Sequence, residues 1–293
     1  MTLRTLLSGL AVMGFVACAG AQTETDEDVS YTMADVDAAP DAWRAVDPEN
    51  LVVFETSKGQ IVIELLPVAA PNHVAQFKAY VRAGLYDGTA FHRVIKDFMA
   101  QGGDVEATHG ADAMMAPLDS EFLFRRKPAD TPLSTIGPAD TADAGFHNGF
   151  PMTTQPGFLA EMSKDGLVES WIPHCPGILS SARTDDPNSA NAQFFLISGR
   201  GQHLDYKYTA KGRALKGLDV IQAIKLGPNQ DGFPIANPDV LISAKMVADM
   251  PENERLSAYV QRTDTAEWEQ ILADADAGRQ KICALPPVPA VVE

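Results

Sequence analysis

The sequence predicts a mainly β protein whose strands form a closed antiparallel barrel, accompanied by two separated helices. Many short apolar runs of strand type, the turn residues between them and two well-separated segments of helical spacing support this fold class. The 293 residues allow one large domain or two small ones, and 45% hydrophobic content supplies a sizeable core. The net charge of −16 argues against nucleic-acid binding, because that affinity depends on Lys and Arg.

The first readable elements begin at residue 51. Residues 51–55 and 60–65 are two apolar runs joined by a short polar turn, which predicts a β-hairpin. A helix begins near Pro71, because apolar residues then recur at helical spacing. Residues 215–224 predict a second helix, and residues 239–247 predict the closing strand.

The stretch FHRVIKDFMAQGGD, residues 91–104, places one arginine on an otherwise apolar pair of strands. Residues of the same parity share a face of a strand, so Arg93 lies among apolar neighbours. Burying an unpaired guanidinium is costly, so Arg93 must reach water, an anion or a ligand. The stretch therefore predicts one wall of an apolar pocket with a single cationic donor. The alternative is an edge strand whose Arg93 extends into solvent.

Three separated motifs carry a family resemblance: FHRVI..FM.QGGD in residues 91–104, PGILS.A in residues 176–182 and NAQFF in residues 191–195. Together they resemble the cyclophilin family of peptidyl-prolyl cis–trans isomerases, and the resemblance spans roughly residues 50–248. It implies an eight-stranded barrel capped by a helix at each open end, with the ligand groove on the outer surface. Residues 105–174 exceed the usual connection and are interpreted as a loop insertion.

The resemblance implies rotation of X–Pro peptide bonds, with Arg93 as the catalytic arginine. Phe98, Met99, Phe195 and Leu204 match the proline pocket, and Gln101 matches the residue that positions the arginine. The complete set of implied substrate-binding residues is Phe98, Met99, Gln101, Ala182, Arg183, Gln193, Phe195, His203, Leu204 and Tyr208. We expect no cofactor, because no metal or nucleotide motif is visible and the reaction needs none.

Three positions depart from the family pattern. His203 stands where many members carry the Trp associated with cyclosporin binding, so we expect weak inhibition by that drug and retained activity. Arg183 replaces a common Asn, and Tyr208 replaces a common His that closes the pocket.

The N-terminus has the features of an export signal: Arg4, an apolar run and small residues at its end. Residues 1–21 are interpreted as a signal peptide, cleaved either before Gln22 or at a lipobox that would lipidate Cys18. The protein is thus expected to be exported to the periplasm, as a soluble protein or a membrane-attached lipoprotein. Residues 22–48 have the composition of an acidic flexible linker.

The isomerase domain is expected over residues 49–249, followed in residues 250–293 by a C-terminal helix and a loose tail. Cys175 and Cys283 could form a disulfide in an exported chain, or remain two buried free thiols. His109, His147 and His174 match no metal motif and are interpreted as surface or loop histidines.

The sequence leads to three functional hypotheses. The first is a peptidyl-prolyl isomerase that acts on proline-containing peptides and unfolded exported proteins. The second is a proline-peptide binding module or scaffold without turnover, which the retained Arg93 argues against. The third, a structural envelope protein, leaves the groove residues unexplained.

Overall fold

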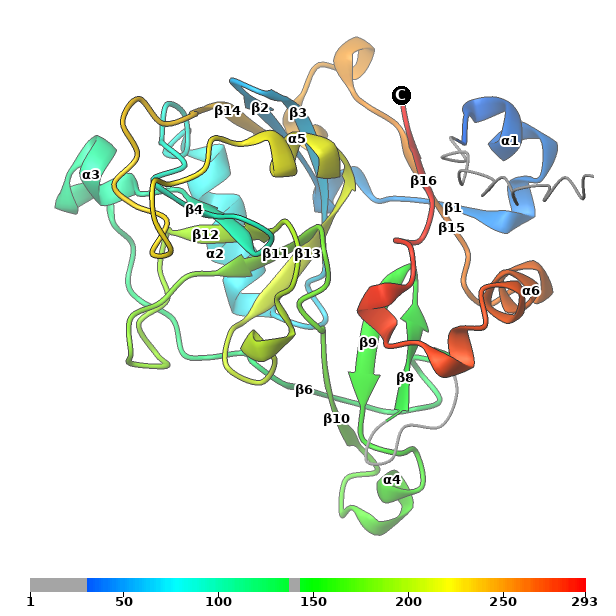
Figure 1. Ribbon diagram of the computed structural model, residues 1–293. Coiled ribbons are helices and arrows are strands. Elements are labelled where there is room, and N and C mark those ends of the chain that lie inside the picture. The colour runs from blue at the N-terminus through cyan, green and yellow to red at the C-terminus, as the bar shows by residue number, and fades with distance from the viewer. Residues whose placement is uncertain (1–30, 137–142) are drawn as a thin grey trace, which may run out of the picture. The chain divides into compact units, whose positions relative to one another are not determined.

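The computed structural model describes residues 31–136 and 143–293. Its centre is an eight-stranded antiparallel sheet in the order β14-β2-β3-β13-β11-β12-β5-β4 (Figure 1). The strands are β2 (Leu51–Thr56), β3 (Gly59–Leu65), β4 (Arg93–Ile95), β5 (Met99–Gly102), β11 (Ile178–Ser181), β12 (Phe194–Ile197), β13 (Ala210–Lys216) and β14 (Leu241–Met246).

Backbone hydrogen bonds join the two outer strands of this sheet through the residues that precede them. The amide of Phe91 donates to the carbonyl of Asp239 at 2.9 Å, and the amide of Gly88 donates to the carbonyl of Leu241 at 2.8 Å. Ala90 and Val240 form an antiparallel bridge between these bonds. The sheet therefore closes on itself, and the predicted eight-stranded barrel is confirmed.

The barrel core contains the inward-facing side chains of the strands and one face of each of two helices. Phe54, Ile61 and Ile63 lie in this core, as strand alternation requires. Helix α2 (Pro71–Arg82) and helix α5 (Leu218–Ala223) pack apolar side chains into the same cluster. The second helix starts later than predicted, because residues 215 and 216 continue β13 and Gly217 turns the chain.

The insertion is a folded subdomain, so its interpretation as a loop was wrong. Its five-stranded sheet has the order β6-β10-β9-β8-β7. The elements of the insertion are α3 (Val105–His109), β6 (Phe124–Arg126), β7 (Ser134–Thr135), β8 (Asp143–His147), β9 (Phe150–Thr154), α4 (Leu159–Met162) and β10 (Val168–Trp171). The strands are short: β7 to β10 pair in sequence order, and β6 pairs with β10 from farther away in the sequence.

The two flanking segments form a third, three-stranded sheet in the order β1-β15-β16. Its strands are β1 (Trp43–Ala45), β15 (Ala258–Gln261) and β16 (Ala290–Val292). Residues 31–48 are thus not a flexible linker, since α1 (Met33–Ala38) and β1 are ordered there. The C-terminal tail is not loose either, because Val288 and Val291 are buried. Both predictions failed because each strand finds its partner far away in the sequence.

The C-terminal extension packs on the outer face of the barrel. Helix α6 (Ala266–Asp274) lies beside β8 in Figure 1, and the rings of Trp268 and Phe146 meet edge to face at 5.3 Å. Leu51 and Val53 of β2 contribute to the same apolar cluster. This explains why β2 is apolar on both faces, a pattern typical of strands covered on both sides.

Parts of the sequence prediction lie outside the described residues. These parts are the signal peptide at residues 1–21, Cys18, and residues 22–30 of the expected linker. Within residues 31–136 and 143–293, no helix has the length and apolar character needed to cross a bilayer.

Lys211 is a lysine buried inside the barrel. Its Nζ donates to Ser181 Oγ at 3.0 Å and lies 4.4 Å from the centre of the Phe77 ring. Ser181 Oγ also lies 2.9 Å from His73 Nδ1, and His73 Nε2 lies 2.9 Å from the carbonyl of Asp119. These groups form a continuous chain if His73 carries its proton on Nε2. Burial lowers the pKa of Lys211 to about 7 and lowers that of His73 as well.

Replacement of Lys211 by Met should stabilise the fold, more so at lower pH. The unfolded lysine keeps a pKa near 10.5, so between pH 7 and 10.5 the unfolded state binds more protons than the folded state. The wild-type free energy of unfolding therefore rises with pH over that window. Below pH 7 the folded state bears the full cost of burying a charged Lys211. The gain in unfolding free energy should be roughly 3 kcal/mol larger at pH 6 than at pH 9.

Urea unfolding of both proteins at the two pH values measures this difference. Lys245→Met is the matched control, because Lys245 is exposed on β14 and its substitution should produce no such pH dependence. A stability gain that is the same at pH 6 and pH 9 would contradict the proposed burial cost.

Candidate functional site

A cavity of about 250 Å³ opens on the outer surface of the barrel. It brings together ten of the eleven residues that the sequence assigned to catalysis or substrate binding. The residues around it are Arg93, Phe98, Met99, Gln101, Ala182, Arg183, Phe195, His203, Leu204 and Tyr208. We call this cavity and its lining the groove.

Strand register aligns the centre of the groove. Arg93 on β4 is paired with Gln101 on β5, and Gln101 is paired with Phe195 on β12. Residues paired across neighbouring strands project from the same face of a sheet. The neighbours Ala100 and Phe194 project to the other face and lie in the barrel core. One row of paired residues thus presents a cation, an amide and an aromatic ring side by side.

The Arg93 guanidinium is held by two neutral acceptors. Its Nε donates to the carbonyl of Asp231 at 2.9 Å, and its Nη1 donates to Gln101 Oε1 at 3.2 Å. Among the residues that the structure describes, Arg93 forms no ion pair and its Nη2 donates to no protein group. The charge therefore stays available to a bound molecule, and the side chain is fixed from behind.

Gln193 lies next to the groove rather than in its lining. Its Oε1 accepts a hydrogen bond of 2.8 Å from Gln101 Nε2, which continues the chain from Arg93. Its backbone carbonyl accepts from the amide of Ala182 at 2.9 Å. Gln193 thus orients the glutamine that holds the arginine.

Aromatic contacts form the apolar part of the groove. The rings of Phe195 and Tyr208 meet edge to face with centres 5.6 Å apart. The rings of Phe98 and His203 lie 4.8 Å apart, so the exposed His203 covers the outer edge of the groove. Met99 and Phe195 are almost fully buried and form its floor. A small apolar ring would be enclosed on several sides here.

Arg183 brings a second cation to the groove. Its guanidinium lies over the Tyr208 ring, 4.4 Å from the ring centre, and its Nε donates to the carbonyl of Lys207 at 2.9 Å. The two departures from the family pattern at these positions therefore contact each other. They close one side of the groove by stacking.

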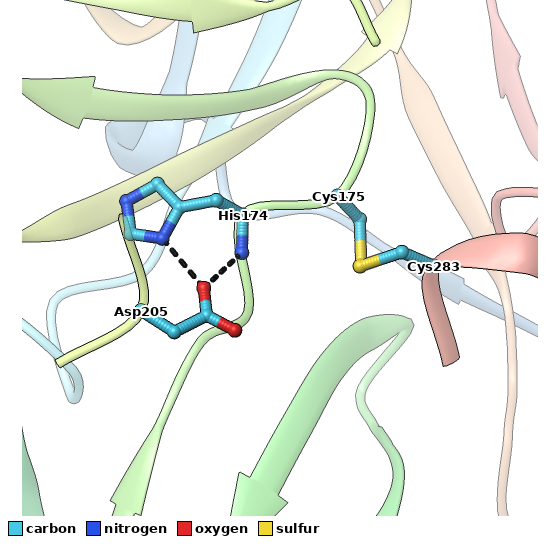
Figure 2. The surroundings of a disulfide bond; sticks show 4 residues. All are labelled: His174, Cys175, Asp205 and Cys283. Atoms are coloured by element: carbon cyan, nitrogen blue, oxygen red, sulfur yellow. Dashed lines mark hydrogen bonds and ion pairs between the residues drawn. A yellow bond between two sulfur atoms is a disulfide. The ribbon is translucent and has the colours of Figure 1, made fainter. Parts of the chain in front are cut away.

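Sequence reasoning missed two residues behind the groove, His174 and Asp205. The Oδ1 atom of Asp205 accepts two hydrogen bonds from His174, one from its backbone amide and one from its Nδ1, each at 2.9 Å (Figure 2). His174 lies in the loop between β10 and β11, as predicted, but it does not lie at the surface, since its side chain is 1% exposed. A lone histidine outside any motif offered no signal, because its partner lies 31 residues away.

The other two histidines of that group lie on the insertion. His109 is exposed, and His147 Nδ1 lies 2.9 Å from the carbonyl of Pro132. In the described ranges, no cluster of three or more His, Cys, Asp or Glu side chains is placed to hold a metal ion.

A disulfide joins Cys175 to Cys283, directly beside His174 (Figure 2). It links the segment before β11 to the C-terminal extension across 108 residues of sequence. Of the two alternatives left open by the sequence, the structure contains the disulfide.

Comparison with known proteins identifies the class that this barrel and groove define. Residues 51–246 match the family described as cyclophilin type peptidyl-prolyl cis-trans isomerase/CLD. The probable peptidyl-prolyl cis-trans isomerase of Brucella suis is 36% identical over 205 residues, which cover 70% of this chain and 86% of that protein. The peptidyl-prolyl cis-trans isomerase cyp18 of Streptomyces antibioticus is 34% identical over 184 residues, which cover 60% of this chain and 83% of that protein.

A solved structure resembles the chain beyond the family domain. The crystal structure of cyclophilin AquaCyp293 from Hirschia baltica has 47% sequence identity and a TM-score of 0.85, covering 90% of this chain and 98% of that one. The chain belongs to the cyclophilin family, and it is a peptidyl-prolyl cis–trans isomerase. Because the structural match exceeds residues 51–246, that protein also shares part of the segments flanking the family domain.

Replacement of Gln101 by Leu should lower kcat/KM about tenfold while the protein stays folded. The substitution removes the acceptor that orients Arg93 Nη1, and a hydrogen bond to a charged group contributes about 1.5–3 kcal/mol. An assay of prolyl isomerisation with a short peptide measures the change. Gln270→Leu on α6 is the control, because Gln270 bonds only to Asp274 there. Equal activities in both variants would contradict a positioning role for Gln101.

Proposed function

We propose that Arg93 is the catalytic residue and that the groove holds the proline of an X–Pro peptide bond. Amide resonance sets a barrier of roughly 18–20 kcal/mol to rotation about this bond. Uncatalysed isomerisation takes tens of seconds or longer, and a 10⁴-fold acceleration corresponds to about 5–6 kcal/mol. No nucleophile or proton transfer is required for this step.

Rotation removes the conjugation of the prolyl nitrogen, whose lone pair then becomes a hydrogen-bond acceptor. A guanidinium N–H beside that nitrogen stabilises the twisted state more than either planar state, which is the condition for catalysis. The observation that supports this role is the Arg93 guanidinium, which Gln101 and the Asp231 carbonyl hold beside an apolar floor while its Nη2 donates to no group of residues 31–136 and 143–293. Phe98, Met99 and Phe195 would enclose the ring of the proline.

The substrates we propose are proline-containing segments of unfolded polypeptides. The groove is open at the surface, and Ala182 on its rim has a small side chain that leaves room for an extended peptide. The two groove arginines lie opposite no carboxylate in the cavity lining. A binding module without turnover would need the same apolar pocket but not an arginine fixed in this way.

Replacement of Arg93 by Ala should reduce kcat/KM by about two orders of magnitude or more. The variant loses the donor that stabilises the twisted bond, while the apolar pocket remains. Isomerisation of a proline tetrapeptide by residues 22–293 measures the loss. Arg125→Ala provides the control, because Arg125 is an exposed arginine of the insertion that pairs with Asp165.

Two results would revise the proposal. Activity that survives Arg93→Ala would exclude the mechanism proposed for this arginine. A folded wild-type protein that binds the peptide without isomerising it would favour the binding module instead.

We also propose that the enzyme is exported and assists folding of exported proteins. The apolar N-terminal segment supports this, and so does the Cys175–Cys283 disulfide, since disulfides persist in oxidising compartments. Fractionation of a Gram-negative host producing residues 1–293 should find the protein outside the cytoplasm. Intact mass then distinguishes a chain starting at Gln22 from one lipidated at Cys18. An unprocessed cytoplasmic protein would contradict export.

A further inference from the structure

The outer wall of the groove is a short loop that carries no strand hydrogen bonds of its own. His203 and Leu204 belong to the 3₁₀ helix η4 (Gln202–Leu204), and Asp205 follows directly. The amide of Asp205 donates to the carbonyl of Gln202 at 3.1 Å, so the carboxylate leaves the helix at a fixed point. The position of this wall therefore depends on what Asp205 binds.

Asp205 binds one residue twice. Its Oδ1 accepts hydrogen bonds from the backbone amide and the Nδ1 of His174, and because a carboxylate oxygen accepts, Nδ1 carries the proton (Figure 2). The two bonds fix both the direction and the distance of the loop. Hydrogen bonds to an ionised group are among the stronger ones in proteins.

The same histidine also contacts the floor of the groove. The His174 ring lies nearly parallel to that of Phe195, with centres 6.1 Å apart. Gly201 at the start of the loop packs against the His174 backbone, where an added Cβ would lie 2.7 Å from the carbonyl oxygen. His174 thus lies between the floor and the wall and sets the space between them.

The disulfide fixes the backbone of His174 from the opposite side. Cys175 is the next residue, and Cys283 belongs to the C-terminal extension outside the family domain. A second tie comes from the insertion, since Trp171 at the end of β10 packs on Tyr206 with ring centres 4.2 Å apart. Both added segments of this chain therefore reach the groove through residues 171–175 and the loop after η4.

We propose that His174 is a positioning residue for substrate binding. Held by the Cys175–Cys283 disulfide, it sets the His203–Leu204 wall of the groove through Asp205. The C-terminal extension thereby contributes to peptide affinity without touching the peptide. Arg93, Gln101 and Phe195 stand on paired strands and keep their places without this contact, so the wall governs binding and not the rotation step.

The test is the effect of Asp205→Ala on KM and kcat for an Ala-Ala-Pro-Phe tetrapeptide, with its Kd measured by calorimetry. We expect KM and Kd to rise at least about fivefold while kcat stays within about twofold, the signature of lost uniform binding. Asp205→Asn, which keeps one acceptor oxygen, should fall between wild type and Asp205→Ala. Unchanged KM and Kd, with or without a lower unfolding temperature, would overturn the proposal.

Asp165→Ala is the matched control. Asp165 Oδ1 also accepts from one backbone amide, that of Leu167, and one side chain, that of Arg125, but it lies on the insertion and lines no part of the groove. KM should be unchanged in this variant. An equal rise in KM would mean that loss of such a carboxylate loosens the fold in general, and it would overturn the specific role.

The double variant Cys175→Ala/Cys283→Ala tests the contribution of the extension. KM should rise in the same direction, and Asp205→Ala should add less in this background than in wild type, because both act on His174. An unchanged KM would overturn the role of the disulfide. This inference rests on the proposed groove, and the Arg93→Ala variant distinguishes failure of the catalytic proposal from failure of the positioning proposal. If the catalytic proposal is wrong, kcat of Arg93→Ala stays unchanged. If the positioning proposal is wrong, KM and Kd of Asp205→Ala stay unchanged.

Discussion

The two-residue period of the strands is the constraint on which this molecule depends. It sends Phe194 and Leu196 of β12 into the barrel, and it sends Phe195 and Ile197 to the outer face. A barrel filled by its own side chains has no room for a polypeptide, so any site for one must lie outside. The outer face is apolar over β12 and β5, and the insertion and the C-terminal extension pack Phe124, Phe150 and Ile282 into the same cluster. Met99 and Phe195 of that cluster form the floor of the groove.

Burial of charge shows how firmly those added segments belong to the fold. Glu64 on β3 pairs with Arg44 at 2.8 Å, and its second arginine neighbour, Arg213, donates to the carbonyl of Val288 at 3.2 Å. Burial lowers the pKa of Arg213 to about 10. Two arginines from different strands thus share one carboxylate, and they connect the N-terminal segment, the barrel and the C-terminal segment. Removal of one partner would leave an uncompensated buried charge.

The sequence was sufficient to predict those elements whose structure is determined by residues close together in the chain. The β2–β3 hairpin, α2 and the row that includes Arg93 and Gln101 depend on alternation, helix spacing and short motifs, and the structure contains all of them. The errors have a common physical cause. Residues 285–293 are rich in Pro and Val, a composition that predicts loose chain, yet β16 forms because β15 offers a free edge. His174 became part of the site because Asp205, remote in sequence, lies opposite it.

Catalysis of bond rotation places contrasting demands on a groove, and this one divides them between two kinds of structure. In the mechanism that we propose, the arginine must stay fixed while the peptide turns, and the paired backbone of strands β4, β5 and β12 provides that rigidity. The His203–Leu204 wall of the groove must admit peptides of varied sequence. A loop that is held by side-chain hydrogen bonds suits this task. A loop held only by its own turns would lose entropy on each binding event, and that cost would weaken affinity. Anchoring the loop to a buried histidine beside a disulfide reduces this cost in advance and leaves the reacting row untouched.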